Sequence, residues 1–393
     1  MAERKAIRLG SVVRTNVSTY SEKEGWAFVN YLDTGNITQD TISEIQRINV
    51  GTDKLPSRAR RKVQIGNIIY STVRPNQLHY GFIKSQPDNF LVSTGFAVID
   101  VNEKEAVPEY IYYFLTHRDV IERLQAIAEQ STSAYPSIKP SDIEDLTIDL
   151  PPIEEQRKIV GLLKMLDDKI KQNTEINNNL LQQAQAVFAK EFLSFDTTPE
   201  GWKESSLLGI ADYLNGLAMQ KFRPKDGENG LPVLKIKELR QGSYDASSEL
   251  CSPSIKKEYI VHDGDVIFSW SGSLLVDFWC GGTCGLNQHL FKVTSTSFDK
   301  WFYFAWTDHH LQKFAAIAAD MATTMGHIKR EELAKAEVLV PPQAEYERIG
   351  GLLAPIYDLV VANRIENRKL ATLRDELLPR LMSGDLAVSE VSL

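Results

Sequence analysis

Two stretches of the chain carry apolar residues at alternating spacings of four and three, the pattern of a coiled-coil helix. One stretch starts at Ile159 and the other at Ile349, each shortly after a diproline. Both seams contain two asparagines at matching positions, namely Asn173, Asn177, Asn363 and Asn367. A buried asparagine fixes the register of a seam, because a slip would leave its amide unpaired. We therefore predict that the helices pack against each other in antiparallel orientation. The alternative, in which each helix packs only on its own globular unit, does not require matched polar positions.

The start of each helix belongs to a long internal repeat. The strings "LPPIEEQRKIVGLL" (150–163) and "VPPQAEYERIGGLL" (340–353) agree at seven of fourteen positions, with an offset of 190 residues. Upstream, "VQIGNIIYS" (63–71) matches "VHDGDVIFS" (261–269) at an offset of 198, and both predict a glycine turn that leads into a buried strand. "LGSVV" from Leu9 resembles "LGIAD" from Leu208. A repeat of this length indicates a duplicated domain rather than a solenoid.

The predicted fold is α+β, with two globular units of mixed α/β structure joined by the two long helices in a pseudo-twofold repeat. The predicted boundaries are globular units at 1–149 and 196–339, helical regions at 150–195 and 340–385, and a tail at 386–393. Roughly 35 residues per helix correspond to about 50 Å, or about one to one and a half DNA turns of roughly 34–36 Å. Pro355 should kink or interrupt the second helix early.

Composition limits the class of protein. The 393 residues are 43% hydrophobic, without an apolar run long enough to span a membrane, so we expect a cytoplasmic protein. Three cysteines, Cys251, Cys280 and Cys284, are too few for a disulfide framework, and no metal site is predicted. The net charge of −8 argues against a nucleic-acid partner, although "SRARRK" (57–62) is a local basic run.

Several strings, taken in order, resemble the specificity subunits of type I restriction-modification systems over essentially the whole chain. They are "PSRARRKVQIGNIIYSTVRP" (56–75), "LPPIEEQRKIVGLL", "AVFAKEFLSFDTTPEGW" (186–202), "VPPQAEYERI" (340–349) and "ELLPRLMSGDL" (376–386). The chain departs from the family pattern at Tyr346, where the first copy has Gln156.

The resemblance implies a non-catalytic, sequence-specific DNA-binding subunit. Its two globular units would be target recognition domains that each read half of a bipartite site in double-stranded DNA, and its helices would dock two methyltransferase subunits. These partners would use S-adenosylmethionine, and restriction/translocase subunits that use ATP and Mg can join them; no cofactor is expected on this chain. The residues agree, because the diprolines lack the polar and aromatic neighbours of an adenine methyltransferase motif and no phosphate-binding loop is present.

Candidate DNA-binding residues lie in loops where the two copies keep their frame but differ in side chains. In the first domain, Arg74 is the candidate for guanine, Asn76 or Gln77 for adenine, and the basic run for phosphate. The full predicted set is Arg58, Arg60, Arg61, Lys62, Arg74, Asn76, Gln77, Tyr80, Ser131, Thr132, Ser133, Tyr135, Lys139, Trp270, Ser271, Ser273, Asn287, Gln288, Thr323, Thr324, His327 and Lys329. Because the loops differ, we predict an asymmetric target with two unrelated half-sites.

Candidate partner-binding residues lie at the two helix starts. They are Pro151, Pro152, Glu155, Gln156, Ile159, Pro341, Pro342, Glu345 and Ile349. Three alternatives remain open: a coiled-coil adaptor that binds protein rather than DNA, the recognition subunit of another restriction class, and an enzyme with an unfamiliar active site.

Overall fold

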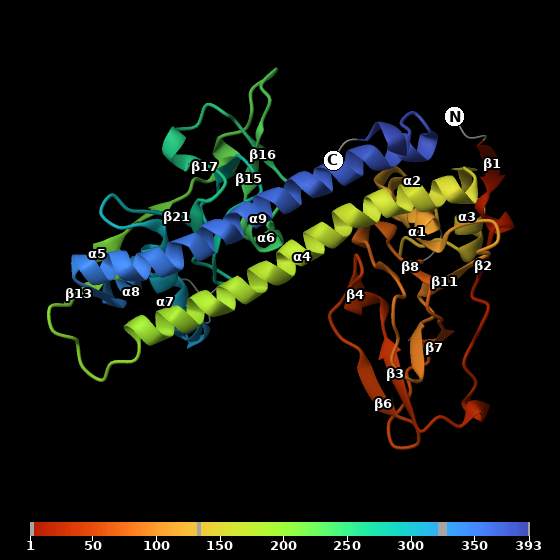
Figure 1. The fold of residues 1–393 in the computed structure, drawn as a ribbon, viewed down its shortest axis with the longest axis horizontal. Coiled ribbons are helices and arrows are strands. Elements are labelled where there is room, and N and C mark those ends of the chain that lie inside the picture. Colours follow the sequence, from red (N-terminus) through yellow and green to blue (C-terminus); the bar gives the residue numbers. More distant parts are fainter. Residues whose placement is uncertain (1–3, 132–134, 321–327, 392–393) are drawn as a thin grey trace. The chain divides into compact units, whose positions relative to one another are not determined.

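Two long helices organise the chain. The computed structural model describes residues 4–131, 135–320 and 328–391. Helix α4 (Ile153–Phe192) and helix α9 (Gln343–Ser383) are the long yellow-green and blue helices of Figure 1. They have 40 and 41 residues, about 60 Å each at about 1.5 Å per residue, and so are longer than the roughly 35 residues expected.

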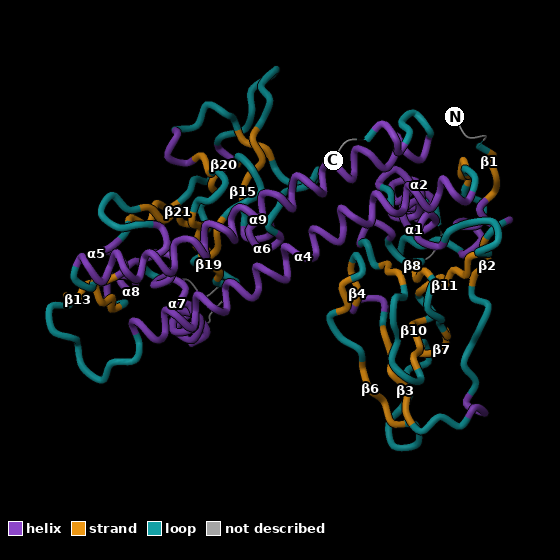
Figure 2. The backbone as a smooth tube through the Cα atoms, in the orientation of Figure 1, coloured by secondary structure: helices purple, strands orange, loops and turns teal. Residues whose placement is uncertain are grey.

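The chain divides into two compact units, and each long helix contributes to both. The first unit comprises Met1–Asp167 and Thr372–Leu393, and the second comprises Asp168–Ala371. The strands and loops of each unit are shown in Figure 2.

The first unit contains a mixed α+β domain. Its strands are β1 (Lys5–Arg8), β2 (Val13–Thr15), β3 (Phe28–Leu32), β4 (Ile37–Thr38), β5 (Thr41–Ile42), β6 (Gln46–Asn49), β7 (Ala59–Lys62), β8 (Ile68–Ser71), β9 (Tyr80–Phe82), β10 (Phe90–Ser93), β11 (Phe96–Val101) and β12 (Thr147–Leu150). Its shorter helices are α1 (Pro108–Thr116), α2 (Arg118–Glu129) and α3 (Pro140–Glu144). The strands form two four-stranded sheets, ordered β6-β3-β10-β7 and β2-β11-β8-β9, and the pairs β1-β12 and β4-β5.

The second unit contains a domain with the same topology. Its strands are β13 (Lys203–Ser206), β14 (Asp212–Asn215), β15 (Leu231–Leu234), β16 (Leu250–Cys251), β17 (Ile260–Val261), β18 (Val266–Ser269), β19 (Leu275–Phe278), β20 (Cys284–Leu286), β21 (Leu290–Thr294) and β22 (Glu337–Val340). Its shorter helices are α5 (Leu207–Ile210), α6 (Ile236–Gln241), α7 (Lys300–Asp320) and α8 (Arg330–Lys335). The sheet orders are β16-β15-β20-β17 and β14-β21-β18-β19, with the pair β13-β22. Each order repeats that of the first domain strand for strand, which confirms the duplication.

The turns and registers of the two domains also correspond. Gly66 and Gly264 both have positive φ, 93° and 82°, at the turn before the buried strands β8 and β18, as the repeat predicted. Near the start, the backbone N–H of Leu9 donates to Leu146 O at 2.8 Å, and that of Leu207 donates to Ala336 O at 3.1 Å. The equivalent of Leu9 is therefore Leu207, one residue before the match suggested by the letters.

Apolar packing joins the C-terminal end of α4 to the second domain. In the second unit, Phe188 and Phe192 of α4 are buried in the same core as the aromatic residues of α7. The ring of Phe192 lies 5.4 Å from that of Trp306 and 5.9 Å from that of Phe302. Aromatic packing of this kind adds to the stabilisation from apolar burial, so this end of α4 is part of the domain core.

The asparagines of α4 and α9 form two polar layers within the second unit. Asn173 Nδ2 donates to Asn367 Oδ1 at 2.9 Å, and Asn363 Nδ2 donates to Asn177 Oδ1 at 2.9 Å. As the residue number rises along α4, the partner's number falls along α9, so the helices are antiparallel. The predicted register role of all four asparagines agrees with these contacts.

Two further asparagine contacts are related by the same internal symmetry. Asn177 Nδ2 donates to Val360 O at 3.3 Å, and Asn367 Nδ2 donates to Ile170 O at 3.2 Å. A shift of 190 residues converts each contact into the other, so these two hydrogen bonds are related by the pseudo-twofold repeat.

The proline in α9 does not interrupt the helix. Helix α9 is continuous through Pro355, contrary to the expected break. Leu353 and Tyr357 on either side of the proline are buried, and this packing offsets the one backbone hydrogen bond that proline removes.

The structure also describes the three cysteines. Cys251, Cys280 and Cys284 are buried free thiols, and burial raises the pKa of Cys280 to about 11 and that of Cys284 to about 12. Within the described ranges, no cluster of three or more metal-ligating side chains was found, and no helix has the length and apolarity to cross a membrane.

Candidate nucleic-acid interface

The described parts of the two predicted loops of the first domain meet at the end of strand β8. Ile138 N–H donates to Thr72 O at 2.8 Å, and Arg74 N–H donates to Pro136 O at 3.0 Å. A β-bridge pairs Val73 with Ser137. Tertiary structure thus brings residues 72–74 and 136–138 together, as a combined binding site requires.

Arg74 is the most constrained of the predicted base-reading residues. Its backbone is left-handed, with φ 48° and ψ 70°, a conformation that costs free energy for a non-glycine residue. Its guanidinium carbon lies 5.1 Å from the ring centroid of Tyr135, which is 61% exposed. This cation–π contact limits the orientations that the guanidinium can adopt.

The other polar residues of this surface differ in exposure. Asn76, Gln77 and Lys139 are exposed, and Ser131 is half-buried. Asn76 N–H donates to Gln125 Oε1 at 3.2 Å, which attaches the loop to α2.

The basic run forms the edge strand β7 rather than a loop. Arg60 pairs with Glu22 at 3.0 Å and Lys62 pairs with Glu24 at 2.6 Å, and the hydrogen bond from Lys62 lowers the pKa of Glu24. Arg58 is exposed. Burial lowers the pKa of Arg61, whose Nε has no hydrogen-bond partner among the described residues. Two of the four predicted phosphate ligands are therefore already neutralised by carboxylates of their own domain.

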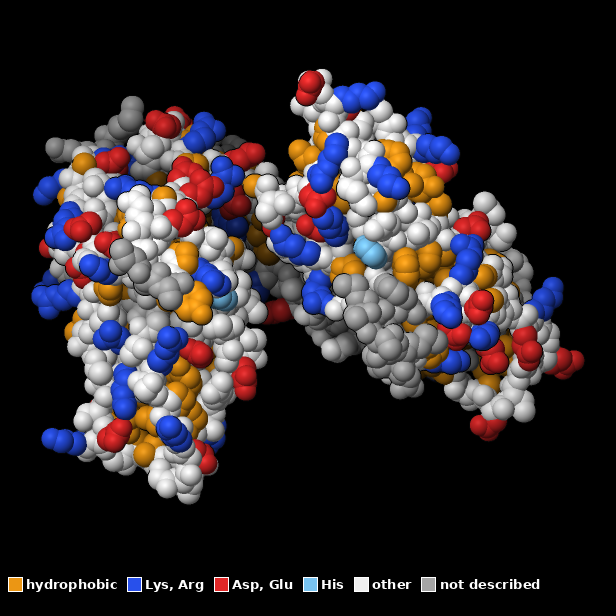
Figure 3. All heavy atoms as spheres, turned by 180° about the vertical axis from the view of Figure 1, so that it is seen from behind, with side chains coloured by type: hydrophobic (Ala, Val, Ile, Leu, Met, Phe, Trp, Pro, Cys, Tyr) orange, Lys and Arg blue, Asp and Glu red, His pale blue; other side chains and the backbone are white. Residues whose placement is uncertain are grey.

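The surface charge is mixed on one face of the molecule. On the face shown in Figure 3, Lys and Arg side chains are interspersed with Asp and Glu on each unit. This agrees with the net charge of −8, and local clusters, rather than a broad basic face, would have to supply phosphate contacts.

The second domain brings its predicted residues together at the equivalent place. Ile328 N–H donates to Trp270 O at 3.0 Å, which repeats the contact between Ile138 and Thr72. The turn between β20 and β21 lies beside this loop, because Ser271 Oγ is 3.3 Å from His289 Nδ1. Trp270 and Gln288 are half-buried, and Ser273 and Lys329 are exposed.

Three predicted DNA-binding side chains are buried by their own domain. Tyr80 is 5% exposed and stacks on Tyr70, with ring centroids 5.8 Å apart. Ser271 is 2% exposed and Asn287 is 6% exposed; Asn287 Oδ1 accepts from the N–H of His289 at 3.3 Å. These side chains support the loops from inside. The predicted residues Thr132, Ser133, Thr323, Thr324 and His327 lie outside the described residues.

Sequence reasoning missed two residues of the second surface. Asn215 Oδ1 accepts from the indole N–H of Trp270 at 3.1 Å. His289 lies between Ser271 and Gln288 and contacts both. His289 directly follows the predicted residues Asn287 and Gln288 in the sequence, but only the fold shows that the histidine faces Ser271.

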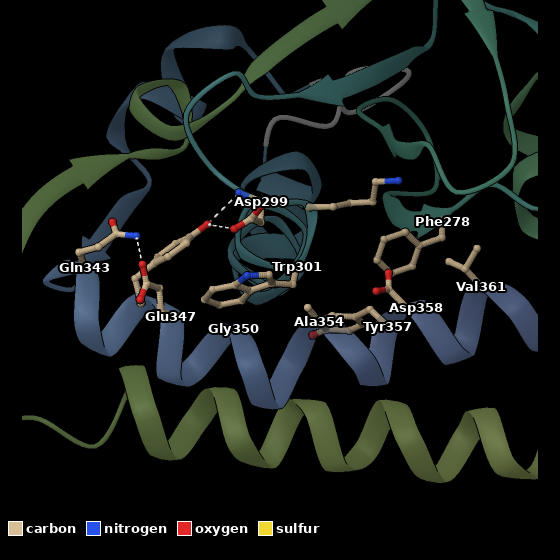
Figure 4. A pocket seen from close by; sticks show the side chains of 12 residues that line it. Phe278, Asp299, Trp301, Gln343, Glu347, Gly350, Ala354, Tyr357, Asp358 and Val361 are labelled. Atoms are coloured by element: carbon tan, nitrogen blue, oxygen red, sulfur yellow. Dashed lines mark hydrogen bonds between the residues drawn. The ribbon is translucent and has the colours of Figure 1, made fainter.

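The departure at Tyr346 preserves a structural contact. Gln156 Oε1 accepts from the N–H of Val107, the residue before α1, at 2.8 Å. The Tyr346 hydroxyl accepts from the N–H of Asp299, the residue before α7, at 2.7 Å and donates to its carboxylate at 3.1 Å (Figure 4). Each side chain thus attaches the start of a domain helix to the start of a long helix.

The predicted partner-binding residues divide by burial. Gln156, Ile159 and Ile349 are at most 1% exposed, and Pro151 and Pro341 are buried as well. Pro152 is exposed, and Glu155, Pro342 and Glu345 are half-buried. A partner at these helix starts would contact the second group, while the first group packs inside the unit.

A cavity of about 590 Å³ lies beside the start of α9 in the second unit. Figure 4 shows Trp301 above Gly350 and the acidic side chains of Glu347 and Asp358 along the same helix. Asp299 adds a third carboxylate to its lining. The cavity is thus acidic and aromatic.

Two arginines of α9 attach the helix to the second domain. Arg368 forms a bidentate ion pair with Asp263, with both nitrogen–oxygen distances 2.7 Å, and this hydrogen bonding lowers the pKa of Asp263. Arg364 Nη1 donates to Asp277 Oδ1 at 2.6 Å. Because bidentate pairs restrict orientation, these contacts fix the domain on the helix.

Comparison with known proteins identifies the family. A family model described as "Type I restriction modification DNA specificity domain" matches twice, at residues 7–182 and 199–374. The chain is 23% identical to the specificity subunit of the type I restriction enzyme HindI from Haemophilus influenzae, over 98% of this chain and 100% of that protein. It is also 23% identical to the MjaIX specificity subunit from Methanocaldococcus jannaschii, over 98% of this chain and 93% of that protein.

A solved structure shares the fold. The S subunit of a type I restriction-modification system from M. genitalium is 13% identical, with a TM-score of 0.54 over 97% of this chain and 96% of that chain. The duplicated domains, the paired long helices and the two family matches lead to one conclusion: the chain belongs to the type I restriction-modification DNA specificity family and is a specificity subunit with two recognition domains.

Proposed function

We propose that the two recognition domains read unrelated halves of an asymmetric, bipartite target in double-stranded DNA. The observation that supports this proposal is the repeated surface at the ends of strands β8 and β18. One backbone contact repeats in both domains, from Ile138 N–H to Thr72 O and from Ile328 N–H to Trp270 O, while the threonine of one domain is replaced by tryptophan in the other. A shared frame with different side chains is the arrangement expected of two readers of different sequences.

The base contacts in the first domain would come from Arg74, with Asn76 or Gln77 beside it. Arginine binds the O6 and N7 atoms of guanine in a bidentate manner, and asparagine or glutamine binds adenine in the same way. Arg58 and Lys139 are exposed residues of the same domain. They would contribute phosphate contacts, which position the domain on the DNA but carry no sequence information.

The subunit would act without catalysis of its own. In this proposal two methyltransferase subunits dock on the long helices and use S-adenosylmethionine, while restriction/translocase subunits use ATP and Mg. The candidate contacts at the helix starts are the exposed Pro152 and the half-buried Glu155, Pro342 and Glu345.

Methylation sequencing tests the proposal. DNA from cells that express this chain with its methyltransferase should carry a split, asymmetric methyladenine motif, and the motif should vanish when the chain is deleted. Unchanged methylation in the deletion, with an active methyltransferase present, would contradict the assignment.

Single-domain variants separate the two readers. Arg74→Ala should relax one half of the motif and leave the other half intact, since each domain is proposed to read alone. A variant that relaxed both halves equally would contradict independent reading.

A further inference from the structure

The turn that carries Gln288 is rigidly mounted in the second domain. Asn287 N–H donates to Leu234 O at 3.2 Å, and Gln288 N–H donates to Leu217 O at 2.9 Å. A Cβ on Gly216 would lie only 2.2 Å from Asn287 O, so the neighbouring backbone approaches as closely as a glycine allows. Side chains on this turn start from a fixed backbone, which a precise recognition site requires.

The imidazole of His289 is held on both of its nitrogens. Its Nδ1 lies 3.3 Å from Ser271 Oγ, and its Nε2 lies 3.3 Å from Gln288 Nε2. With the Gln288 amide in this orientation its nitrogen donates to Nε2, because an amide nitrogen cannot accept, and the ring proton then belongs on Nδ1, from which it would donate to the Ser271 hydroxyl. Ser271 is 2% exposed, and the ring centroid of Trp270 lies 6.2 Å from that of the imidazole.

This arrangement leaves the amide of Gln288 with one donor and one acceptor for an external group. One N–H is directed to His289; within the described part of the chain, the second N–H and Oε1 have no other hydrogen-bond partner. Gln288 is half-buried and so reaches the surface. A paired donor and acceptor on a glutamine amide matches the N7 acceptor and N6 donor of adenine in the major groove.

We propose that Gln288 reads an adenine in the half-site of the second domain, and that His289 is the positioning residue that fixes its amide in the required orientation. The proposal rests on the DNA-reading function above. Without an acceptor on His289, the side-chain amide of Gln288 rotates freely. Its donor Nε2 and acceptor Oε1 then exchange places, and the distinction between adenine and other bases is lost.

Three variants in the full complex with methyltransferase subunits test this role. His289→Phe keeps an aromatic ring beside Trp270 but removes the acceptor. His289→Gln replaces the ring by a side chain whose carbonyl can accept in place of Nε2. Gln288→Ala removes the proposed reading group. Binding is measured on duplexes that carry each base pair in turn at every position of the second half-site.

The expected result is a loss of base preference at one A·T pair. Gln288→Ala and His289→Phe should each reduce that preference by about tenfold, the value of one good base contact. The double variant should lose no more than either single variant, and His289→Gln should retain most of the preference. Arg74→Ala, in the first domain, should leave this position unaffected.

Several results would overturn the inference. His289→Phe could keep the preference, or weaken all duplexes equally; either shows that the histidine does not position a reading group. ¹⁵N NMR of the unmodified complex gives an independent answer, because the proposal requires the Nδ1–H tautomer of His289 and the Nε2–H tautomer contradicts it. If the unmodified complex reads no bipartite motif at all, the proposed function fails instead.

Discussion

The asparagine seam gives a sharp test of how α4 and α9 are held in register. Asn177 is 5% exposed, and its Oδ1 accepts from Asn363 Nδ2 at 2.9 Å. Replacing Asn363 with leucine leaves this buried acceptor without its donor, which costs about 1–3 kcal/mol. Replacing both asparagines with leucine removes the acceptor as well, so the double variant should recover that penalty.

The measurable quantity is the coupling energy between the two substitutions. We expect Asn177→Leu with Asn363→Leu to be about 1–3 kcal/mol more stable than the sum of the single changes. Because a chain of two units does not unfold in one step, the local opening free energy should be measured by hydrogen exchange of amides in residues 170–180 and 360–367.

A mismatched pair provides the control. No hydrogen bond joins Asn173 to Asn363, so a cycle on these two positions should give a clearly smaller coupling energy. If Asn177→Leu and Asn363→Leu were strictly additive, the conclusion that their amides are matched partners would be refuted.

Three further predictions concern the domains. Gly216→Ala should distort the turn at Asn287, because the added Cβ would meet backbone atoms at 2.2–2.5 Å, and base preference in the second half-site should fall while the first half-site is unchanged in binding assays. Lowering the pH should weaken the attachment of the second domain to α9, because Arg368 lowers the pKa of Asp263. The stabilisation from this ion pair is present above about pH 4, the pKa of an unfolded aspartate, and is lost as the pH falls through the lower folded pKa. Hydrogen exchange around residues 263 and 368 from pH 6 to pH 3 should show this loss, and Arg368→Met should abolish its pH dependence. Arg74→Ala should cost about 1–3 kcal/mol of binding to the preferred sequence and much less on a duplex with the matching base pair replaced, measured at fixed salt.

The helix pairing was predictable from the sequence because its signal is local and repeated. Asn173 and Asn363 occupy the same seam position in two copies, and a polar side chain in an apolar seam needs a partner. The break expected at Pro355 was wrong, because buried Leu353 and Tyr357 on either side of the proline support a continuous helix.

The sheet order was not predictable, because it depends on non-local pairing. Strand β3 runs parallel to β10, with Asn30 opposite Phe90, and no periodicity within either segment indicates that partner. The duplication supplied the equivalence of the two domains, so the sequence predicted a shared α+β fold without predicting the order of its strands.

The candidate site was partly predictable. Loops chosen for their differences between copies do meet in space, as Arg74 and Tyr135 show. The basic run was misleading, because alternate side chains of an edge strand, Arg60 and Lys62, pair with Glu22 and Glu24 nearly forty residues earlier. Single-letter patterns cannot reveal such long-range neutralisation.

The small strand pairs at the base of each domain have an evolutionary consequence. Strand β1 pairs with β12 from Lys5 opposite Leu150, and β13 pairs with β22 from Lys203 opposite Val340. The chain thus enters and leaves each domain through two neighbouring strands, so everything between them is a closed cassette. Recombination that joins the chain at these strands could exchange one reading module for another while the asparagine seam remains untouched, and a lineage could acquire new target sequences without redesigning the helices.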